Sequence, residues 1–105
     1  MSTYCVTFRI ADRPVGGASY AERRQRLIDN IHREGMGFWD ATTSFFLVEA
    51  NESTSEFAAR ACAGLSDKFD IVVIFDPDDM SMVYFGAVPS PNVLGSFFRF
   101  ASKLP

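Results

Sequence analysis

The sequence is poor in the residues that form metal and redox sites. Among its 105 residues there are two cysteines, one histidine and one tryptophan. Cys5 and Cys62 lie far apart with no CxxC motif, so the soft ligands of a zinc site are too few. Both cysteines stand among apolar residues, which predicts two buried side chains.

Long apolar runs and phosphate-binding motifs are also missing. No stretch approaches the about 18 apolar residues needed to span a bilayer, and the first residues lack the order of a signal peptide. We therefore expect a cytoplasmic protein with no membrane partner. Neither GxxxxGK(S/T) nor GxGxxG occurs, and no nucleophile motif accompanies His32 to suggest a catalytic triad.

Phenylalanine is the residue in surplus. It supplies 11 residues in a chain that is otherwise ordinary for a soluble domain, with 48% apolar and 22% charged residues. The net charge of −3 argues against binding nucleic acid through bulk positive charge, although a local basic patch could still make nucleic acid a partner. The phenylalanines need apolar surroundings, so their placement guides the interpretation of the fold.

Apolar periodicity and capping signatures predict the elements. Alternating residues predict a strand over 3–11, and capping boxes at Ser19 and Ser53, each followed by glutamate three residues later, predict helices over 19–34 and 53–65. A second strand is predicted over 38–49. Strands over 71–75 and 82–86 are expected to form a hairpin, and helical spacing of Leu94, Phe97 and Phe98 predicts a helix over 93–104.

These four strands and two helices are matched to the β-α-β-β-α-β arrangement, followed by a C-terminal helix. It predicts an α+β fold: a ferredoxin-like sandwich with an antiparallel four-stranded sheet, two helices on one face and a C-terminal helix. Residues 1–88 would form the domain, and 89–105 a helical tail packing on the sheet or on a partner subunit. We expect the strands over 3–11 and 71–75 to be parallel neighbours. The apolar second face of the sheet then requires cover from the tail or from a second copy, which favours a homodimer.

Charged residues near the predicted strand ends are the candidates for a site. If the two central strands are parallel, Arg9 and Asp76 lie at one edge and could form an ion pair. Alternatively, Arg9, Asp12 and Arg13 line a polar site at the dimer seam. Arg23 and Arg24, together with Arg26 and Arg33, make the first helix locally basic, either as a solvated face or as a phosphate-contacting one. Asp76, Asp78 and Asp79 have the oxygen ligands that magnesium prefers, but in the spacing of an ordinary turn.

Three segments carry a resemblance to a known family. Residues 4–10, 43–48 and 70–74, the last preceded by the capped second helix, resemble the CRISPR-associated small ferredoxin-like nuclease family and its SinR-like and virulence-associated protein D-type relatives. The likeness spans about residues 3–86 and rests on element order, length and apolar pattern. It implies a ferredoxin-like homodimer formed through sheet faces and edges and, in some relatives, metal-dependent phosphodiester cleavage. Arg9 stands where the family has its catalytic carboxylate.

Three functional hypotheses remain open. The first is a non-catalytic interaction or regulatory module of the SinR-like type, working as a homodimer without a cofactor. The second is a magnesium-dependent nuclease or RNA-cleaving toxin, in which Asp12, with a carboxylate of the 76–79 turn, binds the metal. The third is a sheet face that binds a small apolar or aromatic ligand.

Overall fold

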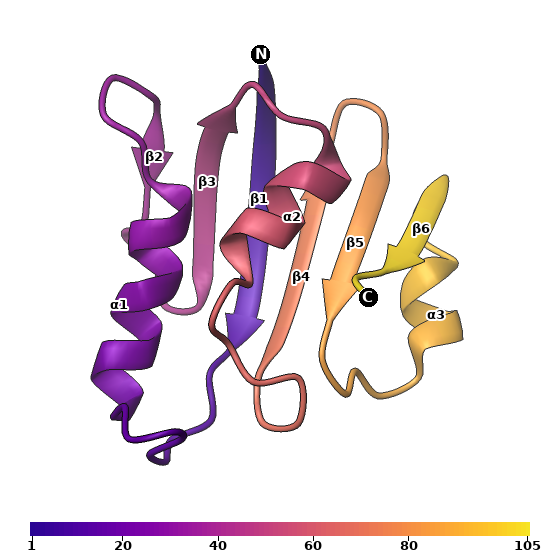
Figure 1. Ribbon diagram of the computed structural model, residues 1–105. Helices are drawn as coiled ribbons and strands as arrows, with labels where there is room; N and C mark the ends of the chain where they lie inside the picture. The colour runs from indigo at the N-terminus through magenta and orange to yellow at the C-terminus, as the bar shows by residue number, and fades with distance from the viewer.

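A computed structural model describes residues 1–105 as one six-stranded mixed sheet with three helices (Figure 1). The α+β class is therefore confirmed, whereas the expected four strands are too few. In chain order the elements are β1 (Ser2–Arg9), α1 (Tyr20–Ile31), β2 (Phe38–Trp39), β3 (Phe45–Ala50), α2 (Thr54–Ala61), β4 (Ile71–Asp76), β5 (Ser81–Phe85), α3 (Pro91–Gly95) and β6 (Phe100–Lys103).

The sheet places the first strand in its interior. The strand order is β2-β3-β1-β4-β5-β6, and β1 is antiparallel to both of its neighbours, β3 and β4. The prediction that β1 and β4 are parallel is therefore wrong. Each helical crossover, β1 to β2 through α1 and β3 to β4 through α2, skips one strand of the sheet and returns to the sheet in the same direction. The strand between the two ends of each crossover runs the other way, which makes β1 and β4 antiparallel.

Both longer helices begin where their capping residues predict. The Ser19 side chain accepts a hydrogen bond from the backbone N–H of Glu22, whose carboxylate accepts one from the Ser19 N–H. Ser53 and Glu56 form the same reciprocal pair at the start of α2. Each pair satisfies backbone donors that the first turn of a helix leaves free, so the start of each helix is encoded locally.

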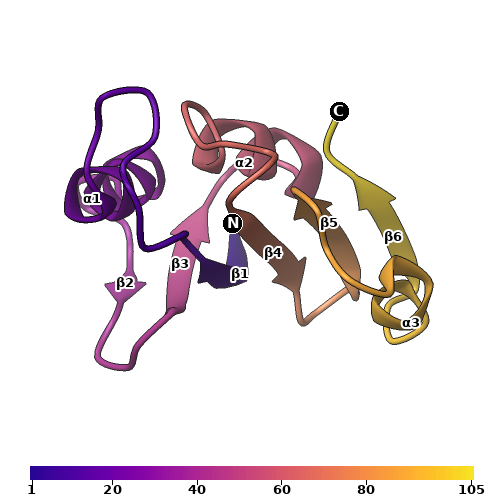
Figure 2. The same ribbon diagram turned by 90° about the horizontal axis from the view of Figure 1, so that it is seen from below.

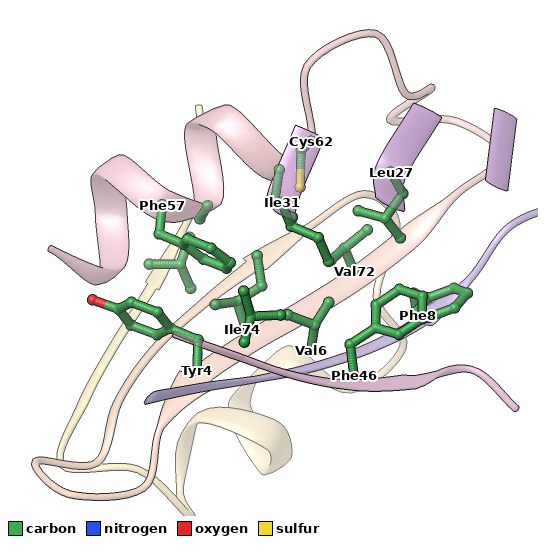
Figure 3. Close-up of a cluster of buried hydrophobic side chains, with 14 of the residues drawn as sticks. Tyr4, Val6, Phe8, Leu27, Ile31, Phe46, Phe57, Cys62, Val72 and Ile74 are labelled. Atoms are coloured by element: carbon green, nitrogen blue, oxygen red, sulfur yellow. The ribbon is translucent and has the colours of Figure 1, made fainter. Parts of the chain in front are cut away.

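Helices α1 and α2 cover one face of the sheet, as expected, while α3 lies on the opposite side (Figure 2). Figure 3 shows helix side chains such as Leu27, Ile31 and Phe57 pointing onto the strand residues Val6 and Ile74. The other labelled residues of this core are Tyr4, Phe8, Phe46, Cys62 and Val72. Phe8 and Phe57 therefore both lie in the core that faces the helices.

The segment predicted as a single strand over 38–49 is a hairpin. It divides into β2 and β3, which are antiparallel, with Phe38 opposite Val48 and Trp39 opposite Leu47. Ser44, just before β3, has a φ of 58°, in the left-handed region that a strand residue does not adopt. The chain reverses between β2 and β3, and this adds β2 to the sheet as an edge strand. The aromatic run hides this reversal in the sequence.

Most of the tail, residues 89–105, does not form the predicted helix. Only Pro91–Gly95 is helical, and Phe100–Lys103 forms β6, which pairs in parallel with β5. The Phe98 ring lies 5.2 Å from that of Phe75, centroid to centroid, so the tail packs on its own sheet. The predicted β4–β5 hairpin is confirmed, and its second strand offers the edge that β6 joins. None of the helices has the length and apolar character needed to cross a bilayer.

Candidate functional site

Arg23, expected on an exposed helix face, is buried. Its side chain is 2% exposed and forms an ion pair with the carboxylate of Asp70, which is fully buried. The same guanidinium donates hydrogen bonds to the carbonyl oxygens of Ala11, at 2.9 Å, and Arg13, at 3.0 Å. Neither the solvated nor the phosphate-contacting interpretation holds for Arg23, because its guanidinium N–H groups donate to acceptors inside the protein.

Asp70 completes this clamp from the other side. Its carboxylate accepts hydrogen bonds from the backbone N–H groups of Ala11, at 3.1 Å, and Ser66, at 2.9 Å. Gly86 packs against the Asp70 backbone with a φ of 92°, and a Cβ there would overlap the Asp70 carbonyl oxygen. The Arg23–Asp70 pair thus ties the loop after β1 to the loop before β4, and this is a structural role.

A signal for the clamp is present in the sequence. Arg23 precedes Leu27 and Ile31 at intervals of four, so it lies on the buried stripe of α1. An arginine on such a stripe requires a buried acid. Asp70, directly before the apolar strand β4, is that acid, and the sequence interpretation missed it.

Arg9 and Asp76 are not brought together. Arg9 pairs with Ile71 at the beginning of β4, whereas Asp76 ends that strand beyond Phe75, which lies opposite Cys5. The proposed ion pair is therefore wrong, because antiparallel strands put the two residues at opposite ends of the sheet. Arg9 is exposed and lies on the face away from α1 and α2, alternating with the core residue Phe8.

The other predicted binding residues lie near the same end as Arg9. Asp12 is exposed in the loop after β1. The guanidinium carbon of Arg13 lies 4.3 Å from the centroid of the Phe69 ring, a cation–π contact. That of Arg24 lies 5.6 Å from the Phe8 ring, on the helix side of the sheet. Arg9 and Arg24 therefore face opposite sides of the sheet and do not form one basic patch.

The carboxylates of the β4–β5 turn lie at the other end of the sheet from Asp12. Asp76 is 6% exposed and accepts a hydrogen bond from the Asp78 N–H at 2.9 Å. Asp79 accepts hydrogen bonds from the Ser81 hydroxyl and N–H, which hold the pKa of that carboxyl below its ordinary value. Asp12 and this turn cannot share an ion, and no group of three metal-ligating side chains occurs.

Both cysteines are buried, as predicted, at 7% exposure for Cys5 and 4% for Cys62. Burial raises the pKa of the Cys62 thiol to about 12. Burial also raises the pKa of Cys5, with a further contribution from the negative charge of Asp76. Both side chains therefore stay as neutral thiols near pH 7, which suits packing rather than nucleophilic chemistry.

The sheet face away from α1 and α2 is apolar and only partly covered, and we call it the open face. Phe98 covers its β4–β5 side at Phe75, and Met82 there is 1% exposed. Toward the other edge, Leu47 is 37% exposed and Trp39 45% exposed. The open face consists of Trp39, Phe45, Leu47, Cys5, Ile71, Val73, Phe75, Met82 and Tyr84.

Comparison with protein-family models, curated proteins and solved structures finds no match to this chain. Of the predicted site residues, the structure assigns Arg23 to the interior. It distributes Arg9, Asp12, Arg13 and Arg24 around one end of the sheet without a shared pocket.

Proposed function

We propose that this protein is an interaction or regulatory module that works as a homodimer through the open face and has no hydrolytic activity. We also propose that β1 to β4, with α1 and α2, are a ferredoxin-like unit of the SinR-like type, to which β5, α3 and β6 are added. Support for this assignment comes from the strand order β2-β3-β1-β4 with each pair antiparallel. Both crossover helices also cover the same face (Figure 2).

The exposed apolar side chains of the open face are the observation that carries the proposal. Leu47 and Trp39 stand side by side on β3 and β2, and Phe45 continues the row on the same face. A contiguous apolar patch on a sheet is costly in water and marks a surface for association. The tail covers only one side of this face, so its exposed apolar side chains lie on β2 and β3.

A second copy of the chain suits this surface. Two-fold pairing buries the same patch on both subunits at once, and it is the commonest closed arrangement of identical chains. Sheets that pack face to face interdigitate the side chains of their inner faces at a spacing of about 10 Å. The side chains of Phe45 and Leu47 are of the kind that such a layer buries.

The proposed absence of hydrolysis follows from where the acidic residues lie. A metal-dependent nuclease would need carboxylates that converge on one ion. Asp12 follows β1 at one end of the sheet and Asp76 ends β4 at the other, and Asp70 is engaged by Arg23. Of the two remaining turn carboxylates, Asp78 and Asp79, the second is hydrogen-bonded to Ser81.

Light scattering coupled to size-exclusion chromatography tests the dimer. We expect twice the protomer mass at micromolar concentration, and the protomer mass for Leu47→Glu, because the substitution puts a charge into the buried layer. Tyr20→Glu is the matched control, since Tyr20 on α1 has a similar exposure, 38%, on the other side of the sheet. It should remain a dimer. A monomeric wild-type chain would overturn the proposal.

A cleavage assay tests the second half of the proposal. RNA and DNA are incubated with the protein in magnesium or manganese, alongside Asp12→Ala. We expect no cleavage by either chain. Cleavage by the wild type that disappears in Asp12→Ala would contradict the non-catalytic assignment and favour the nuclease alternative.

A further inference from the structure

We propose that the two protomers pack end for end, so that Arg9 of each subunit enters the hollow beside Trp39 of the other and pairs with Glu49. This inference rests on the dimer proposed above and specifies its orientation. It assigns binding roles to Arg9, Glu49 and Trp39, each of which lies on or beside the open face.

Arg9 and Glu49 lie at opposite ends of the same face. Arg9 ends β1 next to Ile71, and Glu49 on β3 lies opposite Thr3, near the start of β1. From Thr3 to Arg9 the strand spans about 20 Å, at roughly 3.4 Å per residue. Both side chains are exposed, and the ion pairs within the protomer involve other residues, Arg23 with Asp70 and Arg60 with Glu52.

The Glu49 carboxylate is already held in position. Its Oε1 atom accepts a hydrogen bond from the backbone N–H of Gly37 at 2.8 Å. A Cβ at position 37 would overlap that same oxygen, so glycine is needed for the carboxylate to lie there. The hydrogen bond fixes one oxygen, and the other can accept from a cation.

A hollow of about 270 Å³ lies beside this carboxylate. Thr3, Trp39, Leu47 and Glu49 are among the residues that line it. An arginine is the side chain that best fits such a lining, because its planar guanidinium can stack on the indole and donate to the carboxylate together. The chemistry of the hollow therefore favours a guanidinium group, and Arg9 of a second copy can supply it.

Symmetry decides which Arg9 can reach the hollow. Two sheets that pack face to face are related by an axis in the interface plane, either along the strands or across them. An axis along the strands keeps each Arg9 at the same end as its counterpart, which sets like charges together. An axis across the strands brings Arg9 over Thr3 and Glu49 of the partner subunit, and places Leu47 over the partner's Phe45. Opposite charges and apolar rows then match in the same arrangement.

Complementary charge reversal tests this orientation. In a dimer of Arg9→Glu each of the two symmetric sites holds two carboxylates, and in a dimer of Glu49→Arg each site holds two guanidinium groups. We expect each variant alone to have a dimer dissociation constant raised about tenfold or more by sedimentation equilibrium, since like charges meet at both symmetric sites. An equimolar mixture of the two variants restores both opposite-charge pairs, so its heterodimer should return to about the wild-type affinity.

Two controls separate the orientation from the dimer itself. Arg33→Glu changes the net charge by the same amount as Arg9→Glu, at an exposed position just after the end of α1, and should leave the wild-type dissociation constant unchanged. The urea midpoint of each variant, measured at one concentration, verifies that the protomer is folded. If the wild type dimerises but the single variants do so equally well, or their mixture does not recover, the end-for-end orientation is overturned and the dimer stands. A monomeric wild type overturns both.

Discussion

At the scale of single residues, the arginines of this chain have different roles that their sequence context does not separate. Arg23 pairs with a buried carboxylate, and Arg9 is exposed on the open face. Arg13 and Arg24 lie over aromatic rings. A buried arginine without its acid would leave a charge unpaired in a medium that solvates it poorly. Loss of the Arg23–Asp70 pair should therefore destabilise the fold more than loss of the other interactions of these arginines.

Removing the charge of Asp70 tests that expectation. We expect Asp70→Asn to lower the free energy of unfolding by about 3–5 kcal/mol, because the Arg23 charge stays buried without a counterion. Urea unfolding monitored by circular dichroism measures the loss. Asp67→Asn, at an exposed position in the same loop, should change it by less than about 0.5 kcal/mol. Equal effects of the two substitutions would show that the clamp does not stabilise the fold.

At the scale of elements, local signals were sufficient where the stabilising contacts are local. Ser19 and Ser53 bond to residues three positions away, so both helix starts could be predicted from the sequence. β6 could not, because Phe97, Phe98 and Ala101 fit a helical period and the strand is chosen by the free edge of β5, far from any local signal. The apolar open face could be predicted because the strands are apolar on both sides. The ends of the sheet at which Arg9 and Asp76 lie could not, because they depend on strand direction.

The tail offers a matched pair of phenylalanines for an element-scale test. Phe98 packs against Phe75, whereas its neighbour Phe97 is 70% exposed. Phe98→Ala should lower the free energy of unfolding by about 1–2 kcal/mol, because part of the open face loses its cover. Phe97→Ala should change it by less than about 0.5 kcal/mol. Chemical denaturation at one protein concentration provides both values, and a reversed ranking would contradict the placement of the tail.

At the scale of the whole molecule, the phenylalanine surplus is only partly absorbed by the protomer. Phe8, Phe46 and Phe57 fill the core under the helices, and Phe98 shields Phe75. Phe97 and Phe100 remain exposed, at 70% and 58%. The composition thus predicted more apolar surface than a small sheet with two helices hides. Which surface would stay open could be decided only from the strand order.

A dimer makes stability depend on protein concentration. Because association stabilises only the folded chain, a tenfold rise in concentration should raise the melting temperature of the wild type by about 3 °C. The Leu47→Glu variant should melt at a temperature independent of concentration. Scanning calorimetry at two concentrations makes the comparison. A concentration-independent wild type would show that the folded state is complete as a protomer.

The interior position of β1 also governs when this chain can fold during its synthesis. β1 is made first, yet both strands that flank it, β3 and β4, come later in the chain, the second of them ending at Asp76. The emerging polypeptide therefore has no finished central sheet until β4 has left the ribosome, and its early strands expose unpaired edges meanwhile. Nascent fragments that end before β4 should consequently depend on chaperones, while the completed chain should not.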